Sequence, residues 1–182
     1  MADIGKGRYT KRTFNEERYD LWNNRSDGHN TACINGTCQG VGESYCATDF
    51  VFDEENGVFS MQLKNAYPQE ADIKSYVRSG KIVKDKIVVE DDIRLNKNGK
   101  VDLYYMFVRK PIFYDNTIQI GDICITFDSR FSATIEKMDC SETEYGTILK
   151  AWNAEAVYRL TLSVANIREE TFTLTIEKTK KQ

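Results

Sequence analysis

The chain contains a single histidine, and the residues around it are of types that could support metal binding or proton transfer. His29 lies in the stretch 26–39, directly before Asn30, and this stretch continues into a turn at Asn35-Gly36. A neutral imidazole is the commonest metal ligand in proteins and the usual proton shuttle near neutral pH. His29 is therefore the first candidate for either chemistry. The alternative is a solvated loop histidine without a chemical role.

Five cysteines, at positions 33, 38, 46, 124 and 140, match no metal-binding motif. The first two are separated by the Asn-Gly turn, so they could face each other across a hairpin. An odd count fits poorly with a disulfide framework, and a zinc site would need closer pairs and more partners. We therefore expect free thiols that pack as small apolar side chains in a reducing compartment, which favours the cytoplasm.

Length and composition favour one continuous domain, residues 1–182. A chain of this length can bury roughly 70% of its unfolded surface. The net charge of −3 gives no reason to expect binding to nucleic acid or to an acidic membrane surface. No apolar run approaches the length of a membrane span, and residues 1–8 lack the apolar centre of a signal peptide.

Apolar and polar residues alternate along most of the chain, which predicts short β-strands rather than helices. Residues 101–108 are apolar on both faces, as is typical of a strand that is covered on both sides. A single helical turn capped by Asn15 is expected near the N-terminus. The expected strands are residues 31–34, 37–41, 58–63, 73–78, 81–84, 86–95, 101–108, 158–164 and 172–176, with others around Phe50 and between residues 118 and 127.

The cleanest alternation lies near the C-terminus and predicts a hairpin. Residues 158–164 and 172–176 each place apolar side chains on one face, and the charged residues 168–170 between them are predicted to turn the chain. Residues 96–99 are likewise predicted as a turn. Many short strands without crossover helices favour an all-β antiparallel fold, a sandwich or barrel, and exclude a doubly wound α/β fold.

Three ordered motifs occupy about the first 95 residues. Residues 3–14 contain Asp-x-Gly, a Thr-Tyr-Thr-like run and a Lys-Thr-Phe-like triplet. Residues 19–39 contain His-Asn, then a hydrophobic–Asn–Gly turn and a glutamine. Residues 66–93 contain Tyr-Pro-x-Glu-Ala, an arginine and a strand with acidic residues. In this order the motifs resemble the heparinase II/III-like family of polysaccharide lyases, and the rest of the chain is similar to that family only in its strand-rich character.

The resemblance implies the C-terminal antiparallel β-sandwich of that family, of the supersandwich-like kind. In these lyases an N-terminal α/α-toroid precedes the sandwich, and the polysaccharide binds between the two. The resemblance further implies that this chain corresponds to the sandwich alone, without the toroid and the residues that carry out elimination. We therefore expect a domain of a uronic-acid polysaccharide lyase that has no catalytic residue of its own and is inactive when isolated.

The resemblance also implies part of a metal site. Family members bind zinc or a similar divalent ion through the aspartate of Asp-x-Gly, the histidine of His-Asn and a second histidine that has no counterpart here. Position by position, this assigns Asp3 and His29 as metal ligands. A carboxylate and an imidazole suit such an ion, although four-coordinate zinc takes three or four protein ligands. The alternative for Asp3 is a frayed, acidic chain end.

Several other side chains have two interpretations. Tyr9, Lys11 and Arg12 could contact an acidic glycan, because Lys and Arg pair with sulfate and carboxylate groups; the alternative is a solvated basic arm. Arg78 is expected in an inter-strand ion pair, and the two tryptophans are expected in the core. A different functional hypothesis for the whole chain is a stand-alone carbohydrate-binding or interaction module.

Overall fold

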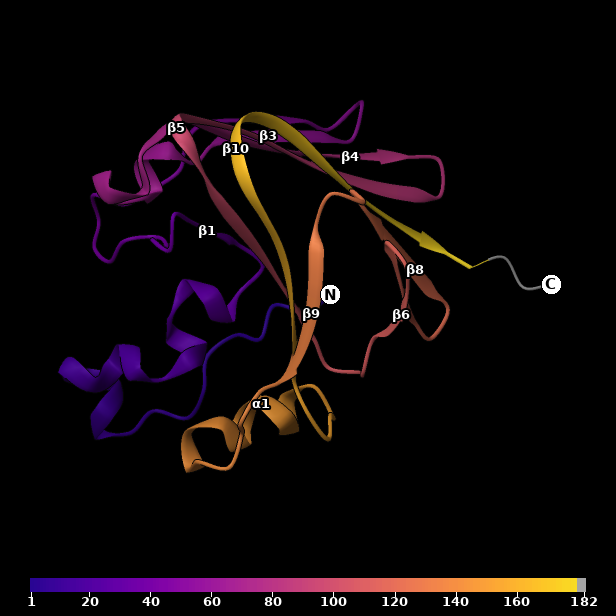
Figure 1. Ribbon diagram of the computed structural model, residues 1–182. Helices are drawn as coiled ribbons and strands as arrows, with labels where there is room; N and C mark the ends of the chain where they lie inside the picture. Colours follow the sequence, from indigo (N-terminus) through magenta and orange to yellow (C-terminus); the bar gives the residue numbers. More distant parts are fainter. Residues whose placement is uncertain (180–182) are drawn as a thin grey trace.

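The computed structural model describes residues 1–179 and shows an antiparallel β-sandwich made from one sheet that folds over itself (Figure 1). The sheet follows the order β2-β3-β4-β5-β10-β8-β7-β6, with β1 paired to β5 and β9 paired to β10. The expected all-β fold class is confirmed. The strands are β1 Ala32–Ile34, β2 Thr48–Asp53, β3 Val58–Gln62, β4 Ile73–Val83, β5 Lys86–Phe107, β6 Ile112–Tyr114, β7 Thr117–Ile120, β8 Ile123–Phe127, β9 Ser132–Lys137 and β10 Tyr158–Lys178.

Two long strands, β5 and β10, belong to both layers of the sandwich. The first half of β5 pairs with β4, and its second half pairs with β1. Along almost all of its length β10 pairs with β5, while its outer edge pairs first with β9 and then with β8. Figure 1 shows the two strands bending together at the top of the view. Where they bend, Asn98 Nδ2 donates a hydrogen bond to Asn166 Oδ1 at 2.9 Å.

The turns expected at residues 96–99 and 168–170 are therefore wrong. Neither segment reverses the chain, because the first lies inside β5 and the second inside β10. Residues 158–164 and 172–176 do not pair with each other; both pair with β5 across irregular register near Ile167. At Gly99, an added Cβ would collide with Oδ1 of Asn35, which accepts a hydrogen bond from the Lys100 N–H at 3.0 Å. Gly99 thus allows the Asn35-Gly36 turn to pack closely against β5.

The Asn35-Gly36 turn is present, but the strand expected at residues 37–41 is not. Ile34 and Thr37 form a single antiparallel bridge, and residues 38–47 contain no strand. Instead of pairing with a following strand, β1 pairs with the second half of β5. The strands expected at residues 73–78 and 81–84 form one continuous strand, β4.

The main core lies between the two layers and contains the predicted apolar faces. Leu160 and Leu162 are buried on one half of β10, and Phe172 and Leu174 are buried on the other half. The alternation in the sequence therefore identified the buried face of β10 on both sides of its bend. This holds because a side-chain period of two is independent of the direction that the strand takes afterwards.

A second, smaller core covers the opposite face of β5. Met106 is fully buried there with Ile4, Leu21 and Ile148, while Tyr105 and Phe107 point into the main core. The strand expected to be covered on both sides is confirmed by this arrangement. Trp22 also belongs to the second core and stacks on Tyr145 at 5.0 Å between ring centres; Trp152, in contrast, is 42% exposed.

The helical elements are short, and those that build the second core lie at one end of the sandwich (Figure 1). Asn15 caps the second of them, since its side chain accepts a hydrogen bond from the Glu17 N–H at 3.0 Å. No helix within residues 1–179 is long and apolar enough to cross a membrane. The 3-10 helices are η1 Lys11–Phe14, η2 Glu16–Asp20, η3 Trp22–Asn24, η4 Ser26–Gly28, η5 Lys64–Ala66, η6 Gln69–Ala71 and η7 Thr143–Tyr145, and the α-helix is α1 Gly146–Ala151.

The register of β10 can be tested with two neighbouring substitutions. Leu160 is fully buried, so Leu160→Ala is expected to lower the free energy of unfolding by about 2–5 kcal/mol. Thr161 points to the other face and is only partly buried, so Thr161→Ala is expected to cost under about 1 kcal/mol. Urea unfolding measures both values, and equal losses would show that the register is shifted by one residue.

Candidate functional site

Asn30 ties the N-terminal segment to the sheet. Its Oδ1 accepts a hydrogen bond from the Met106 N–H at 2.8 Å, and its Nδ2 donates to the Ala2 carbonyl at 3.1 Å. The Ala2 N–H in turn donates to the Met106 carbonyl at 2.9 Å, and Ile4 is 2% exposed. These contacts hold residues 2–4 beside β5. The backbone around Asp3 is therefore anchored rather than frayed.

Asp3 and His29 lie in contact, as the order of the motifs predicted. Nδ1 of His29 is 3.2 Å from Oδ1 of Asp3, and Nε2 is 3.1 Å from the carbonyl oxygen of Asn23. The Gly5 N–H donates to the same carboxylate oxygen at 3.1 Å. Gly5 has a φ of +69°, a conformation that favours glycine, so the Asp-x-Gly sequence turns the backbone to orient the carboxylate.

The hydrogen bond to Asn23 suits His29 to metal binding. Both ring nitrogens face groups that only accept, the Asn23 carbonyl and the Asp3 carboxylate, so a neutral ring can donate to only one of them. With the proton on Nε2, the lone pair of Nδ1 faces Asp3. Histidines that bind metals commonly donate their other N–H to a backbone carbonyl in this way. Tetrahedral zinc at about 2.0–2.2 Å from each ligand would separate two ligand atoms by roughly 3.3–3.6 Å. The observed 3.2 Å is slightly shorter and is also a hydrogen-bond distance.

The protonated ring makes a different set of contacts. Both ring nitrogens then donate, one to the Asp3 carboxylate and the other to the Asn23 carbonyl, and the contact with Asp3 becomes an ion pair. Within residues 1–179, no group of three or more His, Cys, Asp and Glu side chains is arranged to hold a metal ion. The described residues therefore offer two ligands, one or two fewer than zinc takes in proteins.

A buried ion pair supports the His-Asn segment from the other side. Arg78 donates to both oxygens of Asp91, at 2.7 and 3.0 Å, and its Nη1 donates to the Asn30 carbonyl at 2.7 Å. The Tyr76 hydroxyl donates to Asp91 at 2.8 Å, and burial, reinforced by the Asp91 charge, raises the pKa of Tyr76. The inter-strand pair expected for Arg78 is thus confirmed, and it fixes the backbone next to His29.

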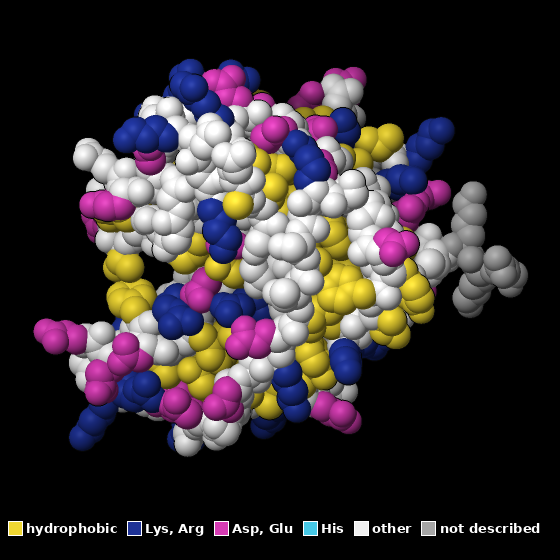
Figure 2. Space-filling view, in the orientation of Figure 1, with side chains coloured by type: hydrophobic (Ala, Val, Ile, Leu, Met, Phe, Trp, Pro, Cys, Tyr) yellow, Lys and Arg dark blue, Asp and Glu magenta, His cyan; other side chains and the backbone are white. Residues whose placement is uncertain are grey.

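His29 also lines a pocket of about 580 Å³. The N-terminal helical segment, η1 to η4, contributes Tyr19 and Arg25 to one wall of the pocket. The loop of residues 38–42 contributes Cys38 and Gln39 to the other wall. Figure 2 shows this hollow at the left of the molecule, between the N-terminal helical segment and the loop above it. The pocket therefore joins the candidate metal ligand to a surface large enough for a sugar residue.

Tyr9, Lys11 and Arg12 do not line this pocket. Tyr9 is 56% exposed, and Lys11 is also exposed. Arg12 forms an ion pair with Glu142, and the hydrogen bond that the guanidinium donates to this carboxylate raises the pKa of Arg12. The three side chains lie on or beside η1, and their contact with a polysaccharide stays a prediction.

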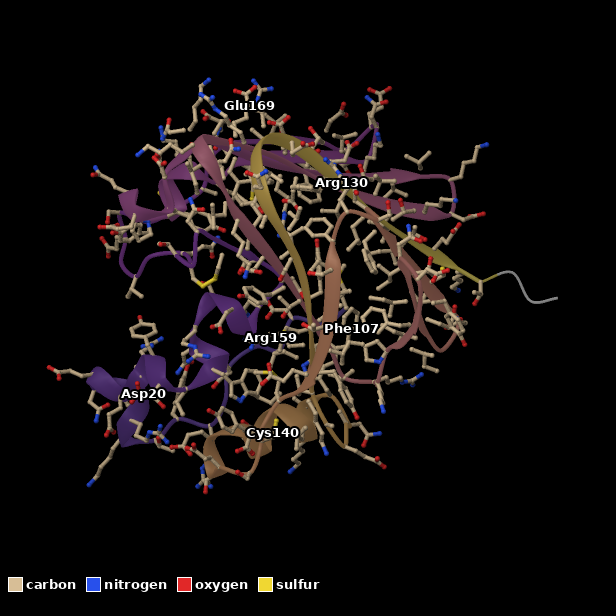
Figure 3. All side chains as sticks on the ribbon, viewed as in Figure 1. Asp20, Phe107, Arg130, Cys140, Arg159 and Glu169 are labelled. Carbon is tan, nitrogen blue, oxygen red and sulfur yellow. A yellow bond between two sulfur atoms is a disulfide. The ribbon has the colours of Figure 1, made fainter. Side chains whose placement is uncertain are left out.

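Cys33 and Cys38 form a disulfide, so the expectation of free thiols is wrong for this pair (Figure 3). The Asn-Gly turn between them brings their Cα atoms to 4.2 Å, as the hairpin spacing allowed. Cys46, Cys124 and Cys140 are free. The argument for a reducing compartment depended on free thiols throughout, and it loses that support.

Sequence reasoning missed the charged residues in the pocket wall and behind it. Arg25 and Asp27 lie two residues apart, but their partner Arg159 lies on β10, 132 residues away from Asp27. No motif joins such distant positions, and only the bent sheet brings them together. The Asn-Gly hairpin was the one local signal that could have identified the disulfide beside this wall.

Comparison with known proteins identifies the fold. No family model and no curated protein matches the sequence. Among solved structures, the heparan sulfate lyase HepC from Pedobacter heparinus has a TM-score of 0.70 at 14% identity. A heparinase III gene product with methylated lysines and a further heparinase III structure also have TM-scores of 0.70, at 18% and 12% identity.

These matches cover 100% of this chain but only 28–29% of the three lyases. The chain thus spans less than a third of their length and has the fold of that part. The fold implied by the three motifs is confirmed.

The role of Asn30 can be tested without altering His29. Asn30→Ala leaves the Met106 N–H and the Ala2 carbonyl without their side-chain partner. Because an unpaired buried polar group costs about 1–3 kcal/mol, we expect the free energy of unfolding to fall by that amount. Amide hydrogen exchange should accelerate at Met106 and Ala2, and the exposed control Asn56→Ala should leave it unchanged. Unaltered exchange at Met106 in Asn30→Ala would refute the role of Asn30 in holding the N-terminal segment on β5.

Proposed function

We propose that this chain is the β-sandwich part of a heparinase II/III-like polysaccharide lyase, in which it forms one wall of the substrate cleft and part of a metal site. The contact between Asp3 and His29 carries the proposal, because the motif order singled out these two residues among all others. The fold shared with the matching part of three heparinase structures supports it. The substrate of the whole enzyme would be an acidic polysaccharide that contains uronic acid, since one of these structures is that of a heparan sulfate lyase.

The reaction of the whole enzyme would be a β-elimination. A general base removes the proton at C5 of the uronic acid, the 4-linked sugar leaves with a proton from a general acid, and polar groups stabilise the enolate-like intermediate. The resemblance assigns the acid and the base to the toroid. We therefore propose no catalytic residue in this chain, and give it the tasks of binding and positioning.

In the proposed metal site, Asp3 and His29 would hold zinc or another divalent ion. The resemblance assigns a third ligand to a histidine, and this sequence contains no histidine besides His29. When bound, such an ion would cross-link the N-terminal segment to the His-Asn segment and place positive charge at the edge of the pocket. The ring orientation fixed by Asn23 supports this role.

Zinc titration tests the proposed ligands. With free thiols alkylated, the 182-residue chain is expected to bind zinc weakly, and either Asp3→Ala or His29→Ala should abolish the binding. The affinity should fall as the pH is lowered, because the imidazole must lose its proton to bind the metal. Calorimetry and the ring resonances of the single histidine report the binding. Asp49→Ala is the matched control, and zinc bound equally well by all four proteins would reject the site.

An activity assay tests the division of tasks. Incubated with heparan sulfate or alginate, the 182-residue chain is expected to form no unsaturated uronate, which would be seen as new ultraviolet absorbance. Weak binding of the same polymers is expected, because a cleft wall supplies only some of the contacts. Tight binding without cleavage would instead favour a stand-alone carbohydrate-binding module, and product formation would contradict the proposed absence of catalytic residues.

A further inference from the structure

The pocket beside His29 has a ready-made cation on its wall. Arg25 lies at the start of η4, and its side chain is 44% exposed. Its Nε donates to Asp27 Oδ1 at 2.9 Å, and its Nη2 donates to Asp27 Oδ2 at 3.1 Å. This two-point contact fixes the plane of the guanidinium. Nη1 makes no hydrogen bond to another group within residues 1–179, so it is available to a ligand.

Asp27 accepts hydrogen bonds from a second arginine as well as from Arg25. Arg159 Nη1 donates to Asp27 Oδ2 at 2.8 Å, and Arg159 Nη2 donates to Glu136 Oε2 at 2.8 Å. The guanidinium of Arg159 also lies 5.2 Å from the ring centre of Tyr104, which anchors it on the sheet. The result is a row of alternating charges that runs from β9 through β10 to the pocket; Figure 3 labels Arg159 between the sheet and the N-terminal segment.

Arg25 and Asp27 both line the pocket, and the row of charges ends there on Arg25. Asp27 is shared between two guanidinium groups, so it neutralises only part of the charge on Arg25. The other negative charge, Glu136, lies on β9 and does not line the pocket. Asp3 faces His29 and does not line it either. Arg25 therefore presents an oriented, incompletely neutralised cation to whatever enters the pocket.

The rest of the pocket suits a sugar and is held in place. Tyr19 is 39% exposed and contributes an aromatic ring to the lining, with the Arg18 guanidinium 5.8 Å from the ring centre, and Gln39 contributes an amide side chain. The Gln39 N–H donates to Ser26 Oγ at 3.1 Å, which joins the loop to the opposite wall. The disulfide holds the loop at Cys38. Such preorganisation lowers the entropic cost of binding.

We propose that this pocket is a binding site for one acidic sugar residue, in which Arg25 pairs with the carboxylate or sulfate group and Tyr19 packs against the sugar ring. The proposal rests on the proposed function and deepens it, since it names the residue that selects acidic over neutral sugars. Asp27 is the positioning residue for Arg25. Uronate and sulfate share the anionic chemistry that the guanidinium recognises, and they are separated by the experiment.

Binding of small sugars to the 182-residue chain tests the proposal. The probes are an unsulfated disaccharide containing glucuronate, its sulfated counterpart and the neutral disaccharide cellobiose, each titrated while amide resonances are followed. The expected result is that at least one acidic probe binds about tenfold more tightly than cellobiose and shifts the resonances of Gln39 and Gly40. The acidic probe that binds more tightly identifies the group that Arg25 selects.

Arg25→Ala should weaken binding of the acidic probe about tenfold and leave cellobiose unaffected. Arg25→Lys should restore part of the affinity, because lysine keeps the charge without the planar fork. Arg94→Ala is the matched control: Arg94 is also exposed and also bonds an aspartate two residues away, but it lies on β5 outside the pocket. Unfolding midpoints establish that the variants fold.

The possible outcomes separate this inference from the proposed function. If wild type binds acidic probes and Arg25→Ala binds them equally well, the pocket assignment is overturned and the lyase proposal is untouched. If cellobiose binds as tightly as the acidic probes, Arg25 does not select charge and the inference is also overturned. If wild type binds neither acidic disaccharides nor acidic polysaccharide, the proposed function fails together with the inference.

Discussion

The site depends on one constraint, the need to pair the buried charge of Arg78. A buried guanidinium is tolerated only when its charge and its N–H groups are satisfied. Asp91 supplies the charge and accepts two hydrogen bonds, and the Asn30 carbonyl accepts a third. The side chain of Asn30 then binds Met106 and Ala2. Through this chain of contacts, the buried pair between β4 and β5 sets the position of the His-Asn segment and of the N-terminal segment.

The bends in β5 and β10 give the site its second support. Because both strands continue past their bends, the first half of β10 carries Arg159 under the pocket while the second half closes the main core with Phe172. A hairpin in place of the bend would have ended the strand at residue 164 and changed its neighbours. The same continuity lets β5 face the main core with Tyr105 and the second core with Met106.

The sequence predicted what depends on local pattern and missed what depends on distant partners. The buried faces of β10 follow from alternation, and Asp3 and His29 follow from the motif order. Residues 96–99 look like a turn, yet whether such a segment reverses or bends depends on Asn35, which lies far away in the chain. The disulfide was missed because an odd number of cysteines was weighed above the hairpin spacing. The link from Asp27 to Arg159 has no local signal at all.

His29 belongs both to the contact with Asp3 and to the lining of the pocket. The protonation state of its ring therefore affects the charge at the pocket. When the neutral ring keeps its proton on Nε2, the lone pair of Nδ1 faces Asp3, as the proposed metal site requires. When the ring is protonated, it carries the positive charge itself and pairs with Asp3. In the proposed metal-bound state a divalent cation would stand at the edge of the pocket that Arg25 also lines, whereas the charge of the protonated ring is offset by Asp3. The proposed metal-bound state would therefore favour an anionic ligand more strongly than the protonated state does, because one carboxylate offsets only part of the charge of a divalent ion.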